Sequence, residues 1–278
     1  MLRKFGFPGA IAAALTAMAA PAHAEWALNM PKGVTTLSGE IYHLHMIIFW
    51  WCVAIGIVVF GVMIFSLVRF RKSQGAVPDT KLLHSTQAEI IWTIIPVVIL
   101  VLMAVPAART LIKIEDASGT DVTIQATGYQ WKWQYEYLGE GVSFFSTLAR
   151  DSDAARQLDS GIDPQSVPNY LLDVDNPLVV PVGKKVRILL TSKDVIHAWW
   201  VPDLAVKKDA IPGLVNEIWF QIQPDKIGLY RGQCAELCGR DHGFMPIVVE
   251  ARSPEDYAAW LAAHKAPATQ NLTANTSN

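Results

Sequence analysis

Four side chains that can bind a soft metal ion lie close together near the C-terminus, between Cys234 and Met245. Two thiols, an imidazole and a thioether follow one another with the spacing Cys-x3-Cys-x3-His-x2-Met. Sulfur ligands combined with imidazole favour copper, whereas calcium and magnesium require oxygen ligands. One cysteine would indicate a single copper ion, but a thiolate can bridge two metals, so two cysteines favour a copper pair.

A second imidazole for such a pair stands upstream, at His197. It lies in the segment Asp194–Trp200, just after a stretch whose pattern predicts a β-strand. In a β-sandwich, the end of an earlier strand can meet a loop near the C-terminus. We therefore expect two cysteines, two histidines and a methionine at one site.

Two other uses of the cysteines fit the spacing. In an oxidising compartment Cys234 and Cys238 can form a disulfide. Tetrahedral zinc is a second alternative, although methionine is a poor zinc ligand. The residues that follow, His242 and Met245, favour copper over both. The third cysteine, Cys52, lies in an apolar run and is interpreted as a packing residue.

The N-terminal half of the chain, before the predicted metal ligands, contains long apolar runs. The chain is 51% hydrophobic and 17% charged, whereas an ordinary soluble domain is about 25% charged. Residues 45–68 lack Asp, Glu, Lys and Arg, and as a helix they would span about 36 Å, enough to cross a membrane. A second uncharged run, 90–108, contains two prolines, which membrane helices tolerate. We predict a transmembrane hairpin with helices at about 45–68 and 90–112; a buried hairpin of a soluble protein is the alternative.

Both ends of this hairpin are expected outside the cytoplasm. Residues 1–24 resemble a cleaved signal peptide, with a basic start, an apolar stretch and an Ala22-x-Ala24 cleavage pattern; an uncleaved anchor is the alternative. The loop between the helices has an excess of Lys and Arg, which keeps such loops in the cytoplasm. The expected order is a signal peptide (1–24), a membrane hairpin (25–112), an exported domain (113–265) and a polar tail (266–278).

The exported part is predicted to be β-rich. Residues 113–278 carry 21 acidic and 15 basic side chains, a surplus that favours a basic partner or cation, or serves solubility alone. Short stretches with alternating polarity or flanking turn signals predict strands at 121–126, 131–137, 178–182, 185–191, 216–222, 228–232 and 246–251. Residues 138–168 look like a long insertion, and Ser253 followed by Pro254 predicts a helix to about Lys265. Many short strands without helices between them indicate a sandwich or Greek-key barrel.

Over residues 25–265 the sequence resembles subunit II of a bacterial aa3-type cytochrome c oxidase, a heme-copper oxidase. The segments that carry the likeness are Gly128–Tyr137, Asp194–Trp199, Asp209–Gly213 and Cys234–Met245. The resemblance implies two transmembrane helices, then an all-β cupredoxin-like Greek-key sandwich with a short C-terminal helix. It also implies a place in the bacterial inner membrane, with the N-terminus and the β domain in the periplasm, and a binuclear copper centre, CuA.

The resemblance further implies a role for each residue of the site. The implied CuA ligands are His197, Cys234, Glu236, Cys238, His242 and Met245. In that family the two thiolates bridge the copper ions, each histidine binds one copper, the methionine is a weak ligand, and the residue matching Glu236 ligates through its backbone carbonyl. The resemblance also implies that the side chain of Glu236 would reach a Mg²⁺ ion shared with subunit I.

Residues outside the copper loop also match the family. Trp131 matches the aromatic residue that receives electrons from cytochrome c, although a Trp in an alternating strand more often packs in a core. Glu89 matches a residue at the cytoplasmic mouth of a proton pathway into subunit I; a helix-end residue is the alternative. The acids that match docking carboxylates for basic cytochrome c are Glu136, Asp175 and Asp194.

The implied function is electron transfer within a proton-pumping oxidase. The subunit would take electrons from cytochrome c and pass them to heme a in subunit I, beside subunit III and membrane lipid. The chain has no Cys-x-x-Cys-His heme signature and too few membrane helices to bury hemes, so oxygen reduction is expected in another chain. The net charge of −2 argues against nucleic-acid binding by bulk positive charge.

Two rival functions remain at this stage. A quinol oxidase subunit II would share the helices and the sandwich but should lack the copper ligands. A non-redox structural or assembly protein would instead join Cys234 and Cys238 in a disulfide. Copper analysis separates the second rival from the redox function.

Overall fold

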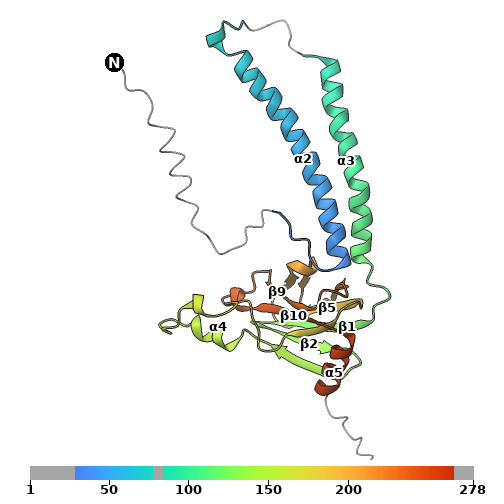
Figure 1. The fold of residues 1–278 in the computed structure, drawn as a ribbon, viewed down its shortest axis with the longest axis vertical. Helices are drawn as coiled ribbons and strands as arrows, with labels where there is room; N and C mark the ends of the chain where they lie inside the picture. The colour runs from blue at the N-terminus through green and yellow to red at the C-terminus, as the bar shows by residue number, and fades with distance from the viewer. Residues whose placement is uncertain (1–28, 78–83, 266–278) are drawn as a thin grey trace, which may run out of the picture. The chain divides into compact units, whose positions relative to one another are not determined.

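The computed structural model describes residues 29–77 and 84–265, in which two long helices are followed by a β-rich domain and a short helix (Figure 1). The predicted signal peptide (1–24) and polar tail (266–278) lie outside the described residues.

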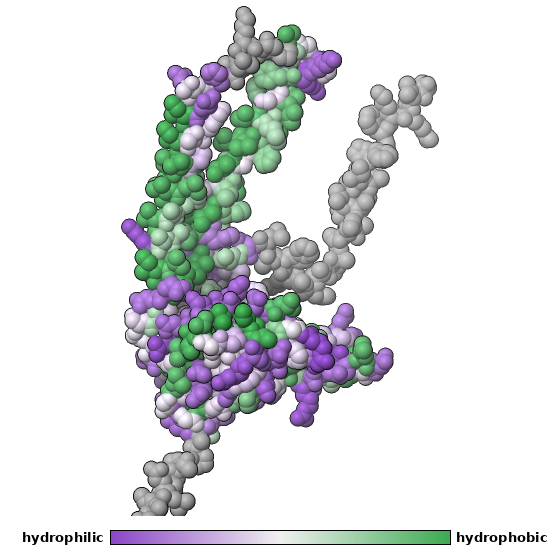
Figure 2. All heavy atoms as spheres, turned by 180° about the vertical axis from the view of Figure 1, so that it is seen from behind, coloured by the Kyte–Doolittle hydropathy of each residue, from purple (hydrophilic) through white to green (hydrophobic). Residues whose placement is uncertain are grey.

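The two long helices are α2 (Thr36–Arg69) and α3 (Thr86–Glu115). Thr35 and Ser85 cap their N-termini with side-chain oxygens, which satisfy free amide groups of the first turn. Both helices are long and apolar enough to cross a membrane, and apolar residues cover much of their surface in Figure 2. The predicted hairpin is therefore present.

Both helices extend beyond the uncharged runs that the sequence marks. Polar residues continue each helix at its ends, and Glu40 of α2 pairs there with Lys113 of α3 at 2.9 Å. The uncharged run covers only the residues suited to the hydrocarbon core of a membrane. The helix itself continues through polar residues to its capping residues.

The β domain consists of two five-stranded sheets. In spatial order the first contains β3 (Val142–Ser146), β2 (Lys132–Tyr137), β1 (Val122–Tyr129), β5 (Val186–Ser192) and β8 (Asn216–Phe220). The second contains β4 (Leu178–Pro181), β10 (Pro246–Arg252), β9 (Gly228–Cys234), β6 (His197–Val201) and β7 (Val206–Ala210). β1 pairs in parallel with β5, and β4 with β10, so both sheets are mixed.

The hydrophobic core lies between these sheets. Trp199 of β6 stacks on Phe220 of β8 with ring centroids 6.3 Å apart, which joins one sheet to the other. The buried Tyr137 hydroxyl donates a hydrogen bond to the carbonyl of Val179, again across the sheets. The predicted sandwich is confirmed.

Three strands and one helix were not expected from the sequence. The segment 138–168, predicted to be an insertion, contains β3 and α4 (Arg150–Ala155). β6 and β7 were also missed, because β6 is buried almost throughout and therefore lacks alternation. The C-terminal helix, α5 (Pro254–His264), begins after its Ser253 cap as predicted. Short 3-10 turns are η1 (Lys72–Gln74), η2 (Pro164–Ser166), η3 (Pro202–Leu204) and η4 (His242–Phe244).

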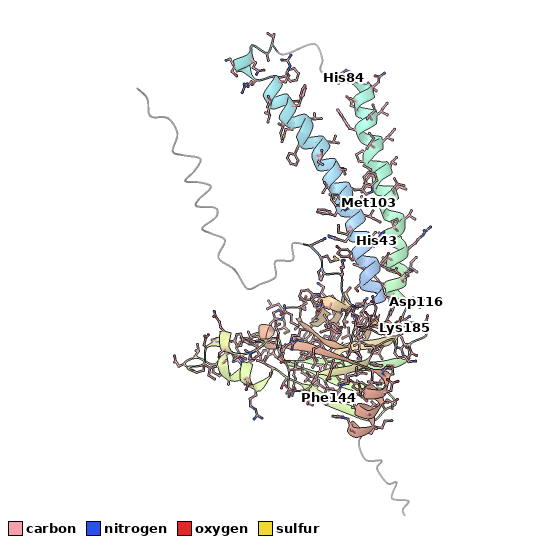
Figure 3. The ribbon with its side chains drawn as sticks, in the orientation of Figure 1. His43, His84, Met103, Asp116, Phe144 and Lys185 are labelled. Carbon is pink, nitrogen blue, oxygen red and sulfur yellow. The ribbon has the colours of Figure 1, made fainter. Side chains whose placement is uncertain are left out.

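Hydrogen bonds attach the helices to the β domain. Thr35, the cap of α2, is fully buried and forms a bridge with Ile222 after β8. At the end of α3 the indole of Trp219 donates to the carbonyl of Lys113. The Lys185 ammonium donates to the carbonyl of Asp116, the residue that follows α3 (Figure 3).

Candidate metal centre

The loop with the predicted ligands joins two paired strands. β9 ends at Cys234 and β10 begins at Pro246, and the two strands pair antiparallel with Gln233 opposite Pro246. The amide of Cys234 donates to the carbonyl of Met245 at 3.0 Å and closes the base of the loop. The sheet therefore fixes both ends of the ligand segment.

His197 reaches this loop from the neighbouring strand. β6 pairs with β9 so that Trp199 stands opposite Cys234, which brings the start of β6 beside the cysteines. Nδ1 of His197 lies 3.9 Å from Sγ of Cys234, and the two sulfurs are 3.8 Å apart. One ligand atom each from His197, Cys234 and Cys238 lies within 4.8 Å of the others, and all three residues are buried.

The other predicted ligands lie around this group. Nδ1 of His242, in η4, is 3.5 Å from Sγ of Cys238. The carbonyl oxygen of Glu236 is 3.3 Å from Sγ of Cys234, and the Glu236 residue is exposed. Met245, the residue before β10, is 1% exposed.

The surroundings of the thiols differ. Burial raises the pKa of Cys234, but hydrogen bonds with His197 and with backbone groups of Ala198 and Glu236 outweigh it and lower the pKa to about 7. Burial, followed by the nearby Cys234 sulfur, raises the pKa of Cys238 to about 12. One thiolate is therefore favoured, and a second requires a cation nearby.

The donor set fits copper. The converging ligand atoms in the described part of the chain come from two sulfurs and an imidazole, with a second imidazole beside one sulfur and a buried thioether in the same loop. Thiolate, imidazole and thioether select copper over oxygen-seeking metals. A positive metal ion would also stabilise both cysteines as thiolates.

The turn between β1 and β2 supports the loop from outside. The side-chain amide of Gln130 and the indole of Trp131 both donate to the carbonyl of Cys238, at 2.9 and 3.2 Å. Gly239 follows with φ of 115°, and a Cβ there would lie 2.9 Å from the Gln130 amide nitrogen. Trp131 is half-buried, so it connects the surface of the domain with the backbone of a ligand residue.

Sequence reasoning missed the side chain of Arg156. Its guanidinium lies 4.4 Å from the ring centroid of Phe244 and 3.9 Å from the carboxylate of Asp241, on either side of His242. These residues and Trp131 line a cavity of about 270 Å³. Nothing local in the sequence marks this contact, because Arg156 follows α4, far from the ligand loop.

Gly128 is a second residue that the sequence did not single out for the site. A Cβ there would lie 2.6 Å from Cδ2 of His197. In the sequence Gly128 stands only at the start of a segment shared with the family, and its position beneath the imidazole depends on the pairing of distant strands.

The predicted docking acids occupy three different settings. Glu136 is exposed on β2. Asp175 accepts hydrogen bonds from both the amide and the hydroxyl of Thr147. Asp194 has a side chain 29% exposed and lies 2.9 Å from Nε2 of His197. The sequence gives only one sign of the contact between Asp194 and His197, which is their separation by three residues.

Glu89 lies away from the copper ligands. It is in the first turn of α3, whereas the β domain contacts Lys113 in the last turn of that helix. Its carbonyl accepts a bond from the Thr93 hydroxyl, and its side chain is half-buried. The structure therefore does not bring it to the metal centre.

Comparisons with known proteins agree in both parts of the chain. Residues 23–110 match the family model "Cytochrome C oxidase subunit II, transmembrane domain", and residues 122–252 match "Cytochrome C oxidase subunit II, periplasmic domain". The probable cytochrome c oxidase subunit 2 of Rickettsia prowazekii is 39% identical over 88% of this chain and 75% of its own length. The cytochrome c oxidase subunit 2 of Arabidopsis thaliana is 38% identical over 88% of this chain and 92% of its own length.

A solved structure is also similar. The periplasmic domain of subunit II of the Bradyrhizobium japonicum cytochrome oxidase is 42% identical, covering 54% of this chain and 96% of that one, with a TM-score of 0.46.

Proposed function

The chain belongs to the cytochrome c oxidase subunit II family, and on this premise we propose that it receives electrons from cytochrome c at a CuA centre and passes them to heme a of subunit I. Oxygen is reduced in subunit I. The observation that carries the proposal is the convergence of His197, Cys234 and Cys238 at the end of one sheet, with His242 beside Cys238.

The residues that would hold the copper pair are His197, Cys234, Glu236, Cys238, His242 and Met245. When bound, the pair takes up and releases one electron with little movement of its ligands. Burial of both cysteines keeps water from the sulfurs, and the paired strands β9 and β10 fix the two ends of the loop. The chain thus supplies a buried, sulfur-rich site whose loop is fixed at both ends.

Trp131 is proposed as the residue that receives electrons from cytochrome c. Its ring is half-buried, and its indole nitrogen donates to the carbonyl of Cys238 at 3.2 Å. This contact supports a short connection from the protein surface to a ligand residue. Glu136, Asp175 and Asp194 are the proposed docking acids for the basic face of cytochrome c.

Three further proposals concern partners and protons. The exposed side chain of Glu236 would bind a Mg²⁺ ion together with subunit I. Glu89 would stand at the cytoplasmic mouth of a proton pathway into subunit I. Subunit III and membrane lipid would complete the surroundings of α2 and α3.

The proposed location is the bacterial inner membrane. The excess of Lys and Arg between the helices supports a cytoplasmic loop, so that the N-terminus and the β domain lie in the periplasm. Residues 1–24 would then be a cleaved signal peptide.

Copper loading of the full chain tests the function. We expect two copper ions per chain in detergent, a near-infrared absorption band and the electron paramagnetic resonance of a shared electron. The matched control replaces both Cys234 and Cys238 by Ser and should give none of these. Absence of copper in the native chain, with a Cys234–Cys238 disulfide, would instead support the rival assembly protein.

A further inference from the structure

The carboxylate of Asp194 lies between two parts of the site that are distant in sequence. Its Oδ2 accepts a hydrogen bond from the amide of Gln130 at 2.7 Å, on the turn that carries Trp131. Its Oδ1 lies 2.9 Å from Nε2 of His197 and accepts from the amide of Val195 at 2.6 Å. Both oxygens are therefore engaged inside the protein, although 29% of the side chain remains exposed.

Packing confines the ring of His197 to a plane. Gly128 lies against the ring, so close that a Cβ at this position would lie 2.6 Å from Cδ2 of His197. The Trp133 ring packs edge-to-face with the imidazole, with 5.9 Å between the ring centroids. A half-turn about the Cβ–Cγ bond returns the ring to the same plane with Nδ1 and Cδ2 exchanged, and leaves its shape almost unchanged. Packing alone therefore cannot decide which atom faces Cys234.

The hydrogen bond between His197 and Asp194 determines which ring atom faces Cys234. An ionised carboxylate only accepts, so Nε2 of His197 must carry a proton, and Nδ1 is the ring nitrogen that remains to bind a metal beside Cys234. Each oxygen of Asp194 also accepts a hydrogen bond from a backbone amide, Oδ2 from Gln130 and Oδ1 from Val195, and such donors favour the ionised form of a carboxylate.

We propose that Asp194 is a positioning residue that fixes the His197 ring with Nδ1 directed to the metal site and ties the Trp131 turn to the same ligand. This role rests on the proposed function only in naming the metal; the ring orientation belongs to the chain itself. It also differs from docking, because it acts without any partner protein.

Metal-free protein gives the first test. Nitrogen NMR of histidine-labelled full chain in detergent, at mildly alkaline pH, reports which ring nitrogen bears the proton, and the His197→Gln variant assigns the signal. We expect Nε2 protonation in the native chain and a mixture of both tautomers in Asp194→Ala. The same single tautomer in Asp194→Ala would overturn the proposal.

A second variant covers the case in which Asp194→Ala does not fold. In Asp194→Asn one oxygen remains to accept from His197, but the amide nitrogen cannot accept from Gln130. We expect Nε2 protonation to survive in this variant, while the Trp131 turn loosens and indole fluorescence changes. An Asp194→Asn chain with native fluorescence and native tautomer would contradict the link between the two parts.

Copper binding gives the second test. We expect Asp194→Ala to weaken copper retention by about tenfold, the effect of losing a partner of a ligand histidine, and to shift the copper hyperfine splitting. Asp225→Asn is the matched control, because it removes one negative charge from an exposed loop where Asp225 pairs only with Lys226 among the described residues. If retention and spectrum in both Asp194 variants equal those of the control, Asp194 acts in docking alone and the proposal fails. If the native chain binds no copper, the proposed function fails, while the tautomer result still decides the ring orientation.

Discussion

The two histidines of the metal centre are held in different ways. His197 begins β6, is fully buried, and has its far nitrogen next to the Asp194 carboxylate. His242 lies in the short turn η4, is partly exposed, and its Nε2 has no hydrogen-bond partner within residues 29–77 and 84–265. The strand side of the site is thus built into the sheet, whereas the loop side depends on contacts from other segments.

Those contacts come from two places. Gln130 and Trp131 hold the carbonyl of Cys238, and Arg156 contacts both Asp241 and Phe244 around His242. Sheet hydrogen bonds are numerous and cooperative, whereas a few side-chain contacts open more easily. We infer that the strand side is preorganised and that the loop side is the adjustable part.

The largest effect is expected from Gly128→Ala, on the strand side. The new Cβ would lie 2.6 Å from the His197 ring and force it to move. We expect a loss of stability of about 1–3 kcal/mol and a loss of copper affinity of about 10–100-fold, measured by urea unfolding and by competition with a chelator.

Gly243→Ala is the matched control on the loop side. Gly243 follows His242, and a Cβ there would meet nothing within 4 Å. Nearly native stability and copper affinity are expected for this variant. Equal losses in both variants would show that the strand side is no more rigid than the loop side.

The next effect is expected from Trp131→Phe. An aromatic ring remains, although a smaller one, but the hydrogen bond to the carbonyl of Cys238 is lost, at a cost of about 1 kcal/mol to the loop. Electron uptake from cytochrome c should slow several-fold while copper content stays native, as stopped-flow absorption and metal analysis would measure. Native rates would refute the assignment of Trp131.

A smaller effect is expected from Arg156→Ala. The half-buried guanidinium pairs with Asp153 at 2.7 Å besides contacting Asp241 and Phe244. Removing it should cost about 1 kcal/mol, and loss of the two contacts with the ligand loop should make metal-free Cys238 react several-fold faster with an alkylating reagent while Cys234 does not. Arg150→Ala, which removes an exposed arginine from the start of α4, is the control. Faster alkylation of both cysteines would mean that Arg156 supports the whole site instead of its loop side.

Local patterns in the sequence predicted the parts of the molecule that depend on neighbouring residues. The helix after Ser253, the apolar hairpin and the ligand spacing from Cys234 to Met245 all follow from such patterns. β6 was missed because a strand buried on both faces has no alternation to detect. The contact of Asp194 with His197 depends on side-chain geometry, and that of Arg156 with the ligand loop on the path of a long segment, so neither could be read from spacing.

The smallest effect is expected from Glu136→Gln, which touches neither side of the site. Glu136 is exposed on β2, whereas Asp175 bonds Thr147 and Asp194 bonds His197. A charge at the rim of an interface changes the rate of encounter, so association with basic cytochrome c should slow about twofold at low salt and converge with the native rate at high salt. Stopped-flow measurements over a salt series provide the comparison. Asp175→Asn should also disturb the hydrogen bonds from Thr147, a structural change that Glu136→Gln lacks. If both variants slow association equally and only at low salt, their internal hydrogen bonds do not distinguish the docking acids.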